Sequence, residues 1–306
     1  MTDENKIAVL IPCYNEEATI AKVIDDCRAA LPEAVIYVFD NCCTDNTASI
    51  AEERGAIVLK EPRQGKGYVI ENMLDRVDAD YYLMIDGDDT YPADCARKLL
   101  DPVMDGKADM VVGARLADYT DQSFRPLHVA GNNLVRWLVN RVFSANLTDI
   151  MSGYRAFNRR VVDRIPVVSS GFEVETDLTI QMLYYRLKML EVTVPYRERP
   201  EGSVSKLNTF RDGFRVLWKI FSLFRAFKPL TFFGGVGLLL VALGILAGLP
   251  PIFGYLSTGM VERFPLAILA TGLVTLGFLC GFLGILLHAM NWRLKELHNV
   301  MVRGRK

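Results

Sequence analysis

The sequence lacks the motifs of several common enzyme classes. Its 306 residues contain no G-x-G-x-x-G after the first predicted strand, which excludes the dinucleotide-binding fingerprint. Gly65-Lys66-Gly67 is not a P-loop, because position 60 is a lysine and no Ser or Thr follows Lys66. The six cysteines form no C-x-x-C pair and show no zinc-ligand spacing. Reduced thiols in a cytosolic domain are therefore expected.

An excess of charge of either sign is also missing. Lys and Arg total 35 and Asp and Glu total 36, a formal net charge of -1, so no nucleic-acid partner is predicted. Residues 1–6 are mostly polar and lead directly into the first predicted strand. Because no cationic segment followed by an apolar run occurs there, no cleaved signal peptide is expected.

Strand-like apolar runs alternate with helical segments over the first two hundred residues. The strands are predicted at 7–11, 35–39, 57–59, 81–85, 110–113 and 189–194, and a loop at 149–157 runs into one more. The helices are expected at 18–31, 44–54, 67–77, 127–143 and 171–187, the first of them capped by Asn15. Such alternation predicts an α/β fold, a mostly parallel sheet with helices on both faces.

Three carboxylates follow the fourth predicted strand. Asp86, Asp88 and Asp89 come at its carboxyl end, the edge where open α/β sheets bind ligands. Gly87 allows a tight turn and close approach of a ligand. Clustered carboxylates repel one another unless a cation lies between them. Mg²⁺ typically takes one or two carboxylates and completes its shell with waters and phosphates. An Asp-x-Asp site for a metal–diphosphate is therefore predicted; the alternative is an acidic surface turn.

Polar loops also follow the first two predicted strands. Tyr14-Asn15-Glu16 comes after the first and Asp40-Asn41 after the second. Since the carboxyl ends of parallel strands meet at one edge, these side chains are expected to converge with the three carboxylates. Such convergence is what a nucleotide site requires.

The C-terminal third changes in character. Residues 207–228 combine aromatic bulk with a basic face that includes Arg211, Arg215 and Lys219, which predicts an amphipathic helix lying in a membrane interface. Two long apolar runs follow, at about 230–249 and 265–290, and runs of about twenty apolar residues span a bilayer. Two transmembrane helices are predicted, the first ending at Pro250-Pro251.

Charge placement predicts the topology of this hairpin. Basic residues precede the first span and follow the second, whereas the loop between them carries only Glu262 and Arg263. By the positive-inside rule, both termini face the cytoplasm. The prediction is an integral membrane protein, in the inner or plasma membrane if bacterial. It comprises a cytoplasmic catalytic domain (1–206), an interfacial helix (207–228), a hairpin (229–290) and a basic tail (291–306).

Glycines recur in both spans: Gly234, Gly235 and Gly237 in the first, and Gly277, Gly281 and Gly284 in the second. Small residues permit close helix packing. They serve either the hairpin itself or a homo-oligomer, and the sequence leaves both open.

Five motifs occur in order along the soluble part, at residues 11–17, 40–47, 86–88, 152–157 and 199–207. Together they resemble the family-two glycosyltransferases of GT-A fold. More narrowly, they resemble the polyprenyl-phosphate glycosyltransferases of dolichol-phosphate mannose synthase type. The two C-terminal spans resemble the bacterial two-helix subgroup.

The resemblance implies roles for particular residues. Those implied for the nucleotide-sugar are Pro12, Tyr14, Glu16, Asp40, Lys66, Asp86, Gly87, Asp88 and Arg115. Asp86 and Asp88 would also hold the metal, Mg²⁺ or Mn²⁺, and with Arg125 they are the implied catalytic residues. Those implied for the acceptor phosphate are Arg125, Ser152, Arg199, Ser205 and Lys206.

The implied reaction transfers a sugar from a UDP- or GDP-sugar to a membrane polyprenyl phosphate, undecaprenyl or dolichyl, with inversion. The product would be a lipid-linked donor for cell-envelope or glycoprotein glycosylation. Because the acceptor oxygen is already anionic, a general base is less necessary than for a hydroxyl acceptor. Glu173 and Glu175 are the candidate bases in the hydroxyl case, or else charges at a helix N-terminus. Asp149 either positions a substrate group or begins a turn.

Two other functions stay open at this point. A polysaccharide or glycolipid synthase would act on a sugar hydroxyl, but the processive enzymes carry Gln-x-x-Arg-Trp, and residues 133–137 have Asn in place of Gln. A non-catalytic membrane adaptor is the second alternative, and the retention of both Asp86 and Asp88 argues against it.

Overall fold

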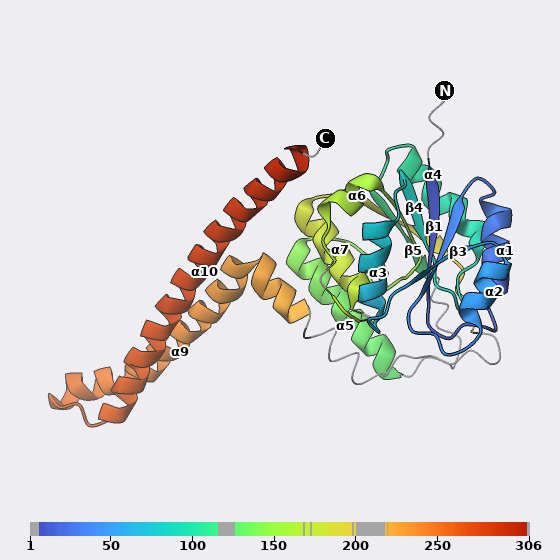
Figure 1. Ribbon diagram of the computed structural model, residues 1–306. Coiled ribbons are helices and arrows are strands. Elements are labelled where there is room, and N and C mark those ends of the chain that lie inside the picture. Colours follow the sequence, from blue (N-terminus) through green and yellow to red (C-terminus); the bar gives the residue numbers. More distant parts are fainter. Residues whose placement is uncertain are drawn as a thin grey trace. The chain divides into compact units, whose positions relative to one another are not determined.

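Two compact units make up the chain, Met1–Ile220 and Phe221–Lys306. The computed structural model describes residues 6–115, 126–167, 169–171, 173–197, 199, 218 and 220–304. The first unit is a sheet with helices packed around it, and the second is built of long helices (Figure 1).

A seven-stranded sheet forms the centre of the first unit. Its strands are β1 (Ile7–Cys13), β2 (Val35–Asp40), β3 (Ile57–Lys60), β4 (Tyr81–Met84), β5 (Met110–Arg115), β6 (Arg155–Asn158) and β7 (Met189–Val194). They lie in the order β3-β2-β1-β4-β6-β5-β7. Only β6 runs antiparallel to its neighbours β4 and β5, and the other pairings are parallel. The predicted α/β fold with a mostly parallel sheet is confirmed.

Helices cover both faces of this sheet. They are α1 (Ile20–Ala30), α2 (Thr47–Glu53), α3 (Lys66–Arg76), α4 (Ala96–Met104), α5 (Pro126–Phe143), α6 (Arg159–Arg164) and α7 (Val174–Tyr185), with a 3-10 turn at Ala93–Cys95. Successive residues of β1 enter opposite cores, as a strand buried on both faces requires. Val9 and Ile11 pack with α1, α2 and α4, whereas Ala8 and Leu10 pack with α3, α6 and α7. The sequence did not predict the short helices at 93–104 and 159–164.

The loop after β1 differs from the prediction. Asn15 is not the cap of α1, because its backbone is left-handed (φ 55°) and the helix begins later, after Thr19. Its side chain instead accepts a hydrogen bond from the amide of Thr44 at 2.7 Å. The hydroxyl of Thr19 donates to the carbonyl of Gly87 at 2.6 Å. These side chains tie the loop to two other strand ends rather than capping α1.

The segment Gly65-Lys66-Gly67 begins α3 in close contact with the chain that precedes α7. A Cβ at Gly67 would lie 1.8 Å from the carbonyl oxygen of Ser169, and one at Gly65 would lie 2.2 Å from that of Ser170. The amide of Gly67 donates to Ser170 at 3.2 Å. Both glycines are therefore explained by close backbone approach.

The second unit contains two long helices, α9 (Pro229–Thr258) and α10 (Phe264–Gly304). Pro229–Thr258 and Phe264–Leu297 are long and apolar enough to cross a membrane, by length and composition. The expected end of the first run at Leu249 is wrong. The helix continues through Pro250 and Pro251 and ends at Thr258, before Gly259, whose left-handed conformation (φ 71°) breaks it.

The polar flanks of the hairpin are helical where they are described. Helix α10 runs on to Gly304, so most of the predicted tail 291–306 continues the second apolar helix. Of the amphipathic segment 207–228, residues 207–217 and 219 lie outside the described part, and residues 220–227 are helical.

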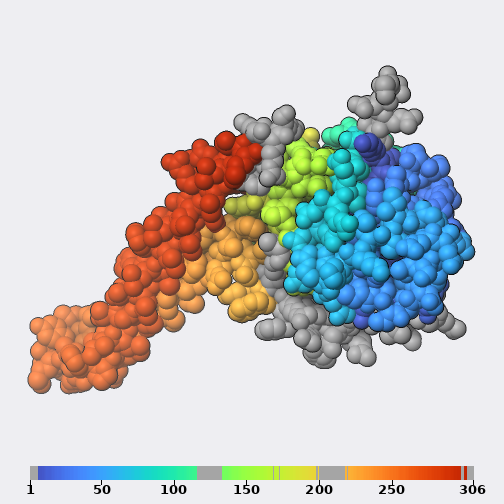
Figure 2. Space-filling view, viewed as in Figure 1, coloured from blue at the N-terminus to red at the C-terminus, as the bar shows by residue number. Residues whose placement is uncertain are grey.

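Two of the predicted glycines form the close contact between α9 and α10, which run side by side in Figure 2. A Cβ at Gly237 would lie 2.6 Å from the carbonyl oxygen of Gly277, and one at Gly277 would lie 2.8 Å from that of Gly237. Gly234 and Gly235 have nothing within 4 Å. Of the three glycines predicted in the first span, Gly237 thus faces the partner helix, and Gly234 and Gly235 face away.

We expect the substitution Gly237→Leu to weaken the hairpin, because its side chain would meet the backbone of α10. The full-length protein in detergent should lose several degrees in its thermal unfolding midpoint, consistent with a cost of roughly 1–3 kcal/mol for overpacking. Gly234→Leu, one turn away on the open side, is the matched control and should change the midpoint little. Equal effects of the two substitutions would contradict this packing.

Candidate active site

Polar side chains from three strand ends converge at the carboxyl edge of the sheet, as predicted. Asp40 ends β2 and is 8% exposed, and its Oδ1 accepts a hydrogen bond from the amide of Cys43 at 2.7 Å. Glu16, after β1, is also 8% exposed, and its amide donates to the hydroxyl of Thr47 at 2.8 Å. Pro12 lies within β1, opposite Phe39 of β2.

Lys66 lies between two carboxylates. Its Nζ is 2.6 Å from Oδ1 of Asp86, at the end of β4, and 2.7 Å from Oε1 of Glu175, in the first turn of α7. Burial alone would lower the pKa of Lys66, but the attraction of Asp86 and Glu175 outweighs it and raises the pKa. Lys66 is therefore charged, and it joins α3, β4 and α7 at one point.

The other oxygen of Asp86 lies against Gly153. A Cβ at Gly153 would come within 2.4 Å of Oδ2, so only glycine leaves room for this carboxylate. This close contact explains why the second residue of the Ser152-Gly153-Tyr154-Arg155 motif is glycine.

Asp88 and Asp89 are held by cations from other segments. Asp88 accepts hydrogen bonds at Oδ1 from the amide (3.1 Å) and hydroxyl (2.6 Å) of Thr90, and Nη2 of Arg199 lies 2.5 Å from Oδ2. Asp89 pairs with Lys22 of α1 at 2.8 Å and with Arg197 at 3.6 Å. Every carboxylate of the stretch therefore has a positively charged partner.

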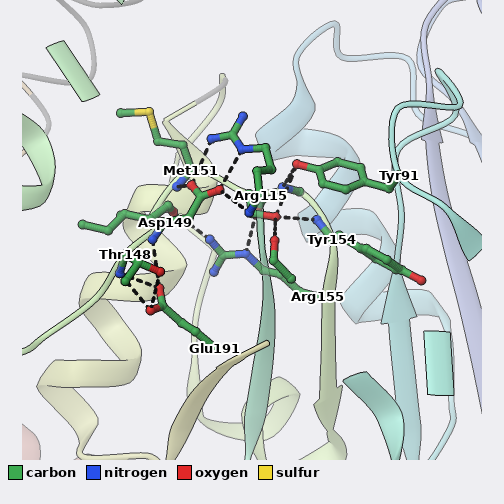
Figure 3. Close-up of polar contacts among 12 residues, drawn as sticks. Tyr91, Arg115, Thr148, Asp149, Met151, Tyr154, Arg155 and Glu191 are labelled. Carbon is green, nitrogen blue, oxygen red and sulfur yellow. Dashed lines mark hydrogen bonds and ion pairs between the residues drawn. The ribbon is translucent and has the colours of Figure 1, made fainter. Parts of the chain in front are cut away.

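Arg115, the last residue of β5, is held by Asp149. Its Nε and Nη2 donate to the two oxygens of Asp149 at 2.7 and 2.9 Å, a bidentate pair (Figure 3). Burial opposes the charge on Arg115, but Tyr91 and Asp149 outweigh burial and raise its pKa. Burial would raise the pKa of Asp149, and the hydrogen bonds from Arg115 lower it instead.

The loop that carries Asp149 is fixed from β7. Glu191 accepts hydrogen bonds from the amide of Thr148 (2.8 and 2.9 Å), from its hydroxyl (2.9 Å) and from the amide of Asp149 (3.0 Å) (Figure 3). Glu191 therefore sets the backbone from which Asp149 holds Arg115. Asp149 thus positions Arg115, a role that the sequence did not predict, and its Oδ1 also accepts from the amide of Met151 at 3.1 Å, as expected of a residue that begins a turn.

Ser152 is bonded within the protein. It is fully buried, its hydroxyl donates to the carbonyl of Gly113 at 2.6 Å, and the hydroxyl oxygen of Tyr91 lies 3.3 Å away. Because Ser152 has one proton and uses it on Gly113, its oxygen accepts from Tyr91. The acceptor contact implied for Ser152 is therefore not supported, and its role is to orient the loop.

A fully buried arginine, Arg155, binds the backbone of the loop at residues 150–152. Arg155 donates to the carbonyl oxygens of Ile150 (2.8 Å), Ser152 (2.9 Å) and Glu175 (3.0 Å), and to the hydroxyl of Thr179 (3.0 Å). Burial lowers its pKa, and these acceptors, together with Sδ of Met110 at 3.7 Å, satisfy its five donors without a hydrogen-bonded carboxylate.

The loop before α3 has its own buried carboxylate. Glu61 is 2% exposed. Its carboxylate accepts hydrogen bonds from Nε and Nη2 of Arg63 at 2.9 and 3.0 Å and from the side-chain Nδ2 of Asn72 at 2.7 Å. The hydrogen bonds from Arg63 outweigh burial and lower the pKa of Glu61 to about 2. Asn41 donates to the carbonyls of Glu61 and Arg63 and accepts from the amide of Gly65, which places this loop beside the end of β2.

The structure brings most of the predicted residues together at one edge. Arg125, Ser205 and Lys206 lie outside the described residues, so their implied roles stay predictions. The two candidate bases are both engaged: Glu173 accepts from the amide of Gly171 at 3.2 Å, and Glu175, 4% exposed, pairs with Lys66.

Several residues of the site were given no role from the sequence. These are Lys22, Glu61, Tyr91, Gly153, Arg155, Glu191 and Arg197. Gly153 and Arg155 stand inside a motif that the sequence analysis quoted, so the motif was the available signal. The others have no signal in the sequence: Lys22, Tyr91, Glu191 and Arg197 have partners that are distant in the chain, and the pairing of Glu61 with the nearby Arg63 belongs to no motif.

The donor set fits a hard divalent cation that is completed by its substrate. Asp86 and Asp88 offer carboxylate oxygens, the ligands that Mg²⁺ and Mn²⁺ prefer. Among the described residues no group of three or more His, Cys, Asp or Glu forms a metal cage. Two carboxylates are enough for Mg²⁺, which takes its remaining ligands from phosphates and water.

The fold and this carboxylate edge define an α/β protein of GT-A type. Residues 8–165 match the family model described as Glycosyl transferase family 2. The chain belongs to glycosyl transferase family 2. The predicted fold family and enzyme class, a hexosyltransferase, are confirmed.

The relatives agree with this assignment. The chain is 35% identical to Glycosyltransferase AglJ of Haloferax volcanii over 246 residues, which is 80% of each chain. It is 31% identical to a dolichyl-phosphate hexose transferase of the same organism over 208 residues, 68% of this chain and 89% of that protein.

A solved structure shares the fold. It is glucosyl-3-phosphoglycerate synthase from Mycobacterium tuberculosis in complex with Mn²⁺, UDP-glucose and phosphoglyceric acid. The TM-score is 0.60 at 23% identity, covering 72% of this chain and 79% of that one. At this identity the likeness shows the architecture alone.

We expect Glu61→Gln to lower stability near neutral pH, with a cost that shrinks in acid. Because the pKa of Glu61 is about 2 in the fold and its ordinary value is 4.5, its stabilisation is present above about pH 4.5 and is lost as pH falls toward 2. With Arg63 half exposed, the cost at pH 7 should be about 1–2 kcal/mol.

The measurement is the thermal unfolding midpoint of wild type and variant from pH 7 to pH 3. Glu71→Gln, which removes the more exposed partner of Arg63, is the control and should change the midpoint little. A wild-type-minus-E61Q difference that stays constant down to pH 3 would show that Glu61 is not the titrating group.

Proposed function

We propose that this enzyme transfers a sugar from a nucleotide-sugar to the phosphate of a membrane polyprenol, undecaprenyl or dolichyl, with inversion at the anomeric carbon. The observation that carries the proposal is the cluster of Asp86 and Asp88 beside Lys66, Arg115 and Arg199 at one edge of the sheet. Carboxylates for a metal and guanidinium groups for phosphates are the two requirements of this chemistry.

The donor half uses the strand ends. Tyr14, Glu16 and Asp40 would line the nucleoside side, and Asp86 and Asp88 would hold Mg²⁺ or Mn²⁺ together with the diphosphate. When bound, such a cation neutralises the charge of the departing nucleoside diphosphate. Lys66 fixes the orientation of Asp86, and Arg115, clamped by Asp149, presents a pre-oriented cation to a phosphate.

The contacts of Glu175, one of the two candidate bases, agree with an anionic acceptor. Glu175 is buried, and its carboxylate already has a partner within the protein, Nζ of Lys66 at 2.7 Å. A hydroxyl acceptor needs a base in the transition state, whereas a phosphate oxygen attacks as it is. This favours a phosphate over a sugar hydroxyl as the acceptor.

The apolar hairpin supplies a reason for a lipid acceptor. Helices α9 and α10 would anchor the enzyme in the bilayer, with the catalytic unit and both termini in the cytoplasm. Arg199 follows β7 on the chain that leads to this hairpin, and it is a candidate partner of the acceptor phosphate. The relative named as a dolichyl-phosphate hexose transferase supports an acceptor of this class.

The test is a transfer assay with the full-length protein in detergent, Mg²⁺ or Mn²⁺, labelled UDP- and GDP-sugars, and polyprenyl phosphate. We expect label to enter an organic-extractable lipid only when metal is present. Asp88→Asn should reduce this transfer by at least about a hundredfold, because it removes a ligand of a cation worth several kcal/mol.

Asp163→Asn is the control for that substitution, since its carboxylate is 43% exposed and pairs with Arg159 of the same helix, α6. It should leave transfer unchanged. Label that stays water-soluble with every donor would overturn the phosphate acceptor and favour a sugar hydroxyl. Transfer by D88N at the wild-type rate would overturn the role of the metal.

We expect Asp149→Asn to lower kcat/KM for the donor by about tenfold or more, because it breaks a bidentate ion pair worth roughly 1.5–3 kcal/mol. Arg115→Lys keeps the charge but loses the planar fork, so it should show a similar loss. The measurement is steady-state transfer with circular dichroism as a check of folding. Near wild-type kinetics for R115K would show that the geometry of Arg115 is unimportant.

A further inference from the structure

The chain that follows β7 lies across the turn that carries Asp88 and Asp89. We name its described residues, 195–197 and 199, the strap. The amide of Arg197 donates to the carbonyl of Thr90 at 2.9 Å, and its guanidinium lies 3.6 Å from Asp89. Two residues on, Arg199 reaches Asp88 at 2.5 Å. The strap is thus attached to the carboxylate turn by one backbone bond and two ion pairs.

Only one oxygen of Asp88 is open to a cation. Its Oδ1 already accepts two hydrogen bonds from Thr90, at 2.6 and 3.1 Å, which fix the rotation of the carboxylate. Its Oδ2 is the oxygen that Arg199 occupies. The side chain of Asp88 is 7% exposed, so water compensates little of its charge. Leaving a buried carboxylate without a cation is costly, so a cation at Oδ2 stabilises Asp88.

We propose that Arg199 is an internal counter-cation of Asp88, and that it exchanges with the divalent cation at the same oxygen. Two positive groups on one carboxylate oxygen repel each other, so binding of a metal–diphosphate at Asp88 releases Arg199. This inference rests on the proposed function, because it takes Asp88 as a metal ligand.

The exchange couples the two substrates. While Arg199 is paired with Asp88, its charge is committed to the protein. After release, the same guanidinium no longer neutralises Asp88 and turns to a phosphate, for which its planar fork is suited. The acceptor phosphate thereby gains a cationic partner only once the donor and its metal are in place. Binding in the order donor then acceptor follows from the exchange at the Arg199–Asp88 ion pair.

The test measures Mn²⁺ binding alone, without donor or lipid, by the electron paramagnetic resonance signal of free Mn²⁺ over the full-length protein. Arg199→Gln removes the competitor and should tighten Mn²⁺ binding by roughly fivefold or more, the size expected when a partly buried charged pair no longer has to be broken. Arg197→Gln is the matched control. It makes the same change in net charge two residues away, at Asp89, and should tighten binding less than twofold.

Equal tightening by R199Q and R197Q would overturn the proposal, because a general loss of positive charge would then explain both. Unchanged or weaker Mn²⁺ binding by R199Q would also overturn it. If R199Q does not fold, Arg199→Lys gives the same comparison. It keeps the charge but shortens the side chain and loses the fork, and it should tighten binding two- to threefold.

Failure of the proposed function has a different signature. If the metal site itself is wrong, Asp88→Asn leaves Mn²⁺ binding unchanged and no Arg199 variant matters, which overturns both. If only the exchange is wrong, D88N abolishes Mn²⁺ binding and transfer proceeds in wild type, while R199Q and wild type bind Mn²⁺ equally.

Discussion

Three carboxylates within four residues must each be neutralised, and the site depends on how the chain does so. Asp86, Asp88 and Asp89 are 22, 7 and 11% exposed, too little for water alone to screen them. Lys66 comes from α3, Arg199 from the chain after β7, and Lys22 from α1. Each ion pair therefore joins the end of β4 to another element. The ion pairs that neutralise the carboxylates of the site are therefore also tertiary contacts that hold the fold together.

Local patterns were enough to predict the strands and the edge at which the site lies. The run at 81–85 predicted a buried strand followed by three carboxylates, and β4 has that place in the sheet. The partners of those carboxylates could not be predicted, since Lys66 is 20 residues from Asp86 and Lys22 is 67 residues from Asp89. The antiparallel direction of β6 was hidden for a similar reason: hydrophobic runs report burial and not strand direction.

In the second unit, too, composition predicted the helices but not the contacts between them. Length and absence of charge predicted two long helices, but not that α9 passes through Pro250 and Pro251. In the sequence Gly234 and Gly237 look equivalent, and only the rotation of the helix separates the glycine that meets α10 from the one that does not. The sequence therefore shows where a helix contains proline or glycine, but the position of the neighbouring helix determines which glycine forms a contact.

The burial of Arg155 affects how segments of the first unit can unfold locally. Its guanidinium is fully buried and bonded to the carbonyls of residues 150, 152 and 175, which belong to the loop before β6 and to the first turn of α7. If either segment unfolded locally, a charge in the core would lose its hydrogen bonds while still shielded from water, at a cost of several kcal/mol. Loop and helix are thereby a single cooperative unit, and fluctuations that expose one must release the other. The segment that orients Arg115 is therefore tied through Arg155 to the first turn of α7.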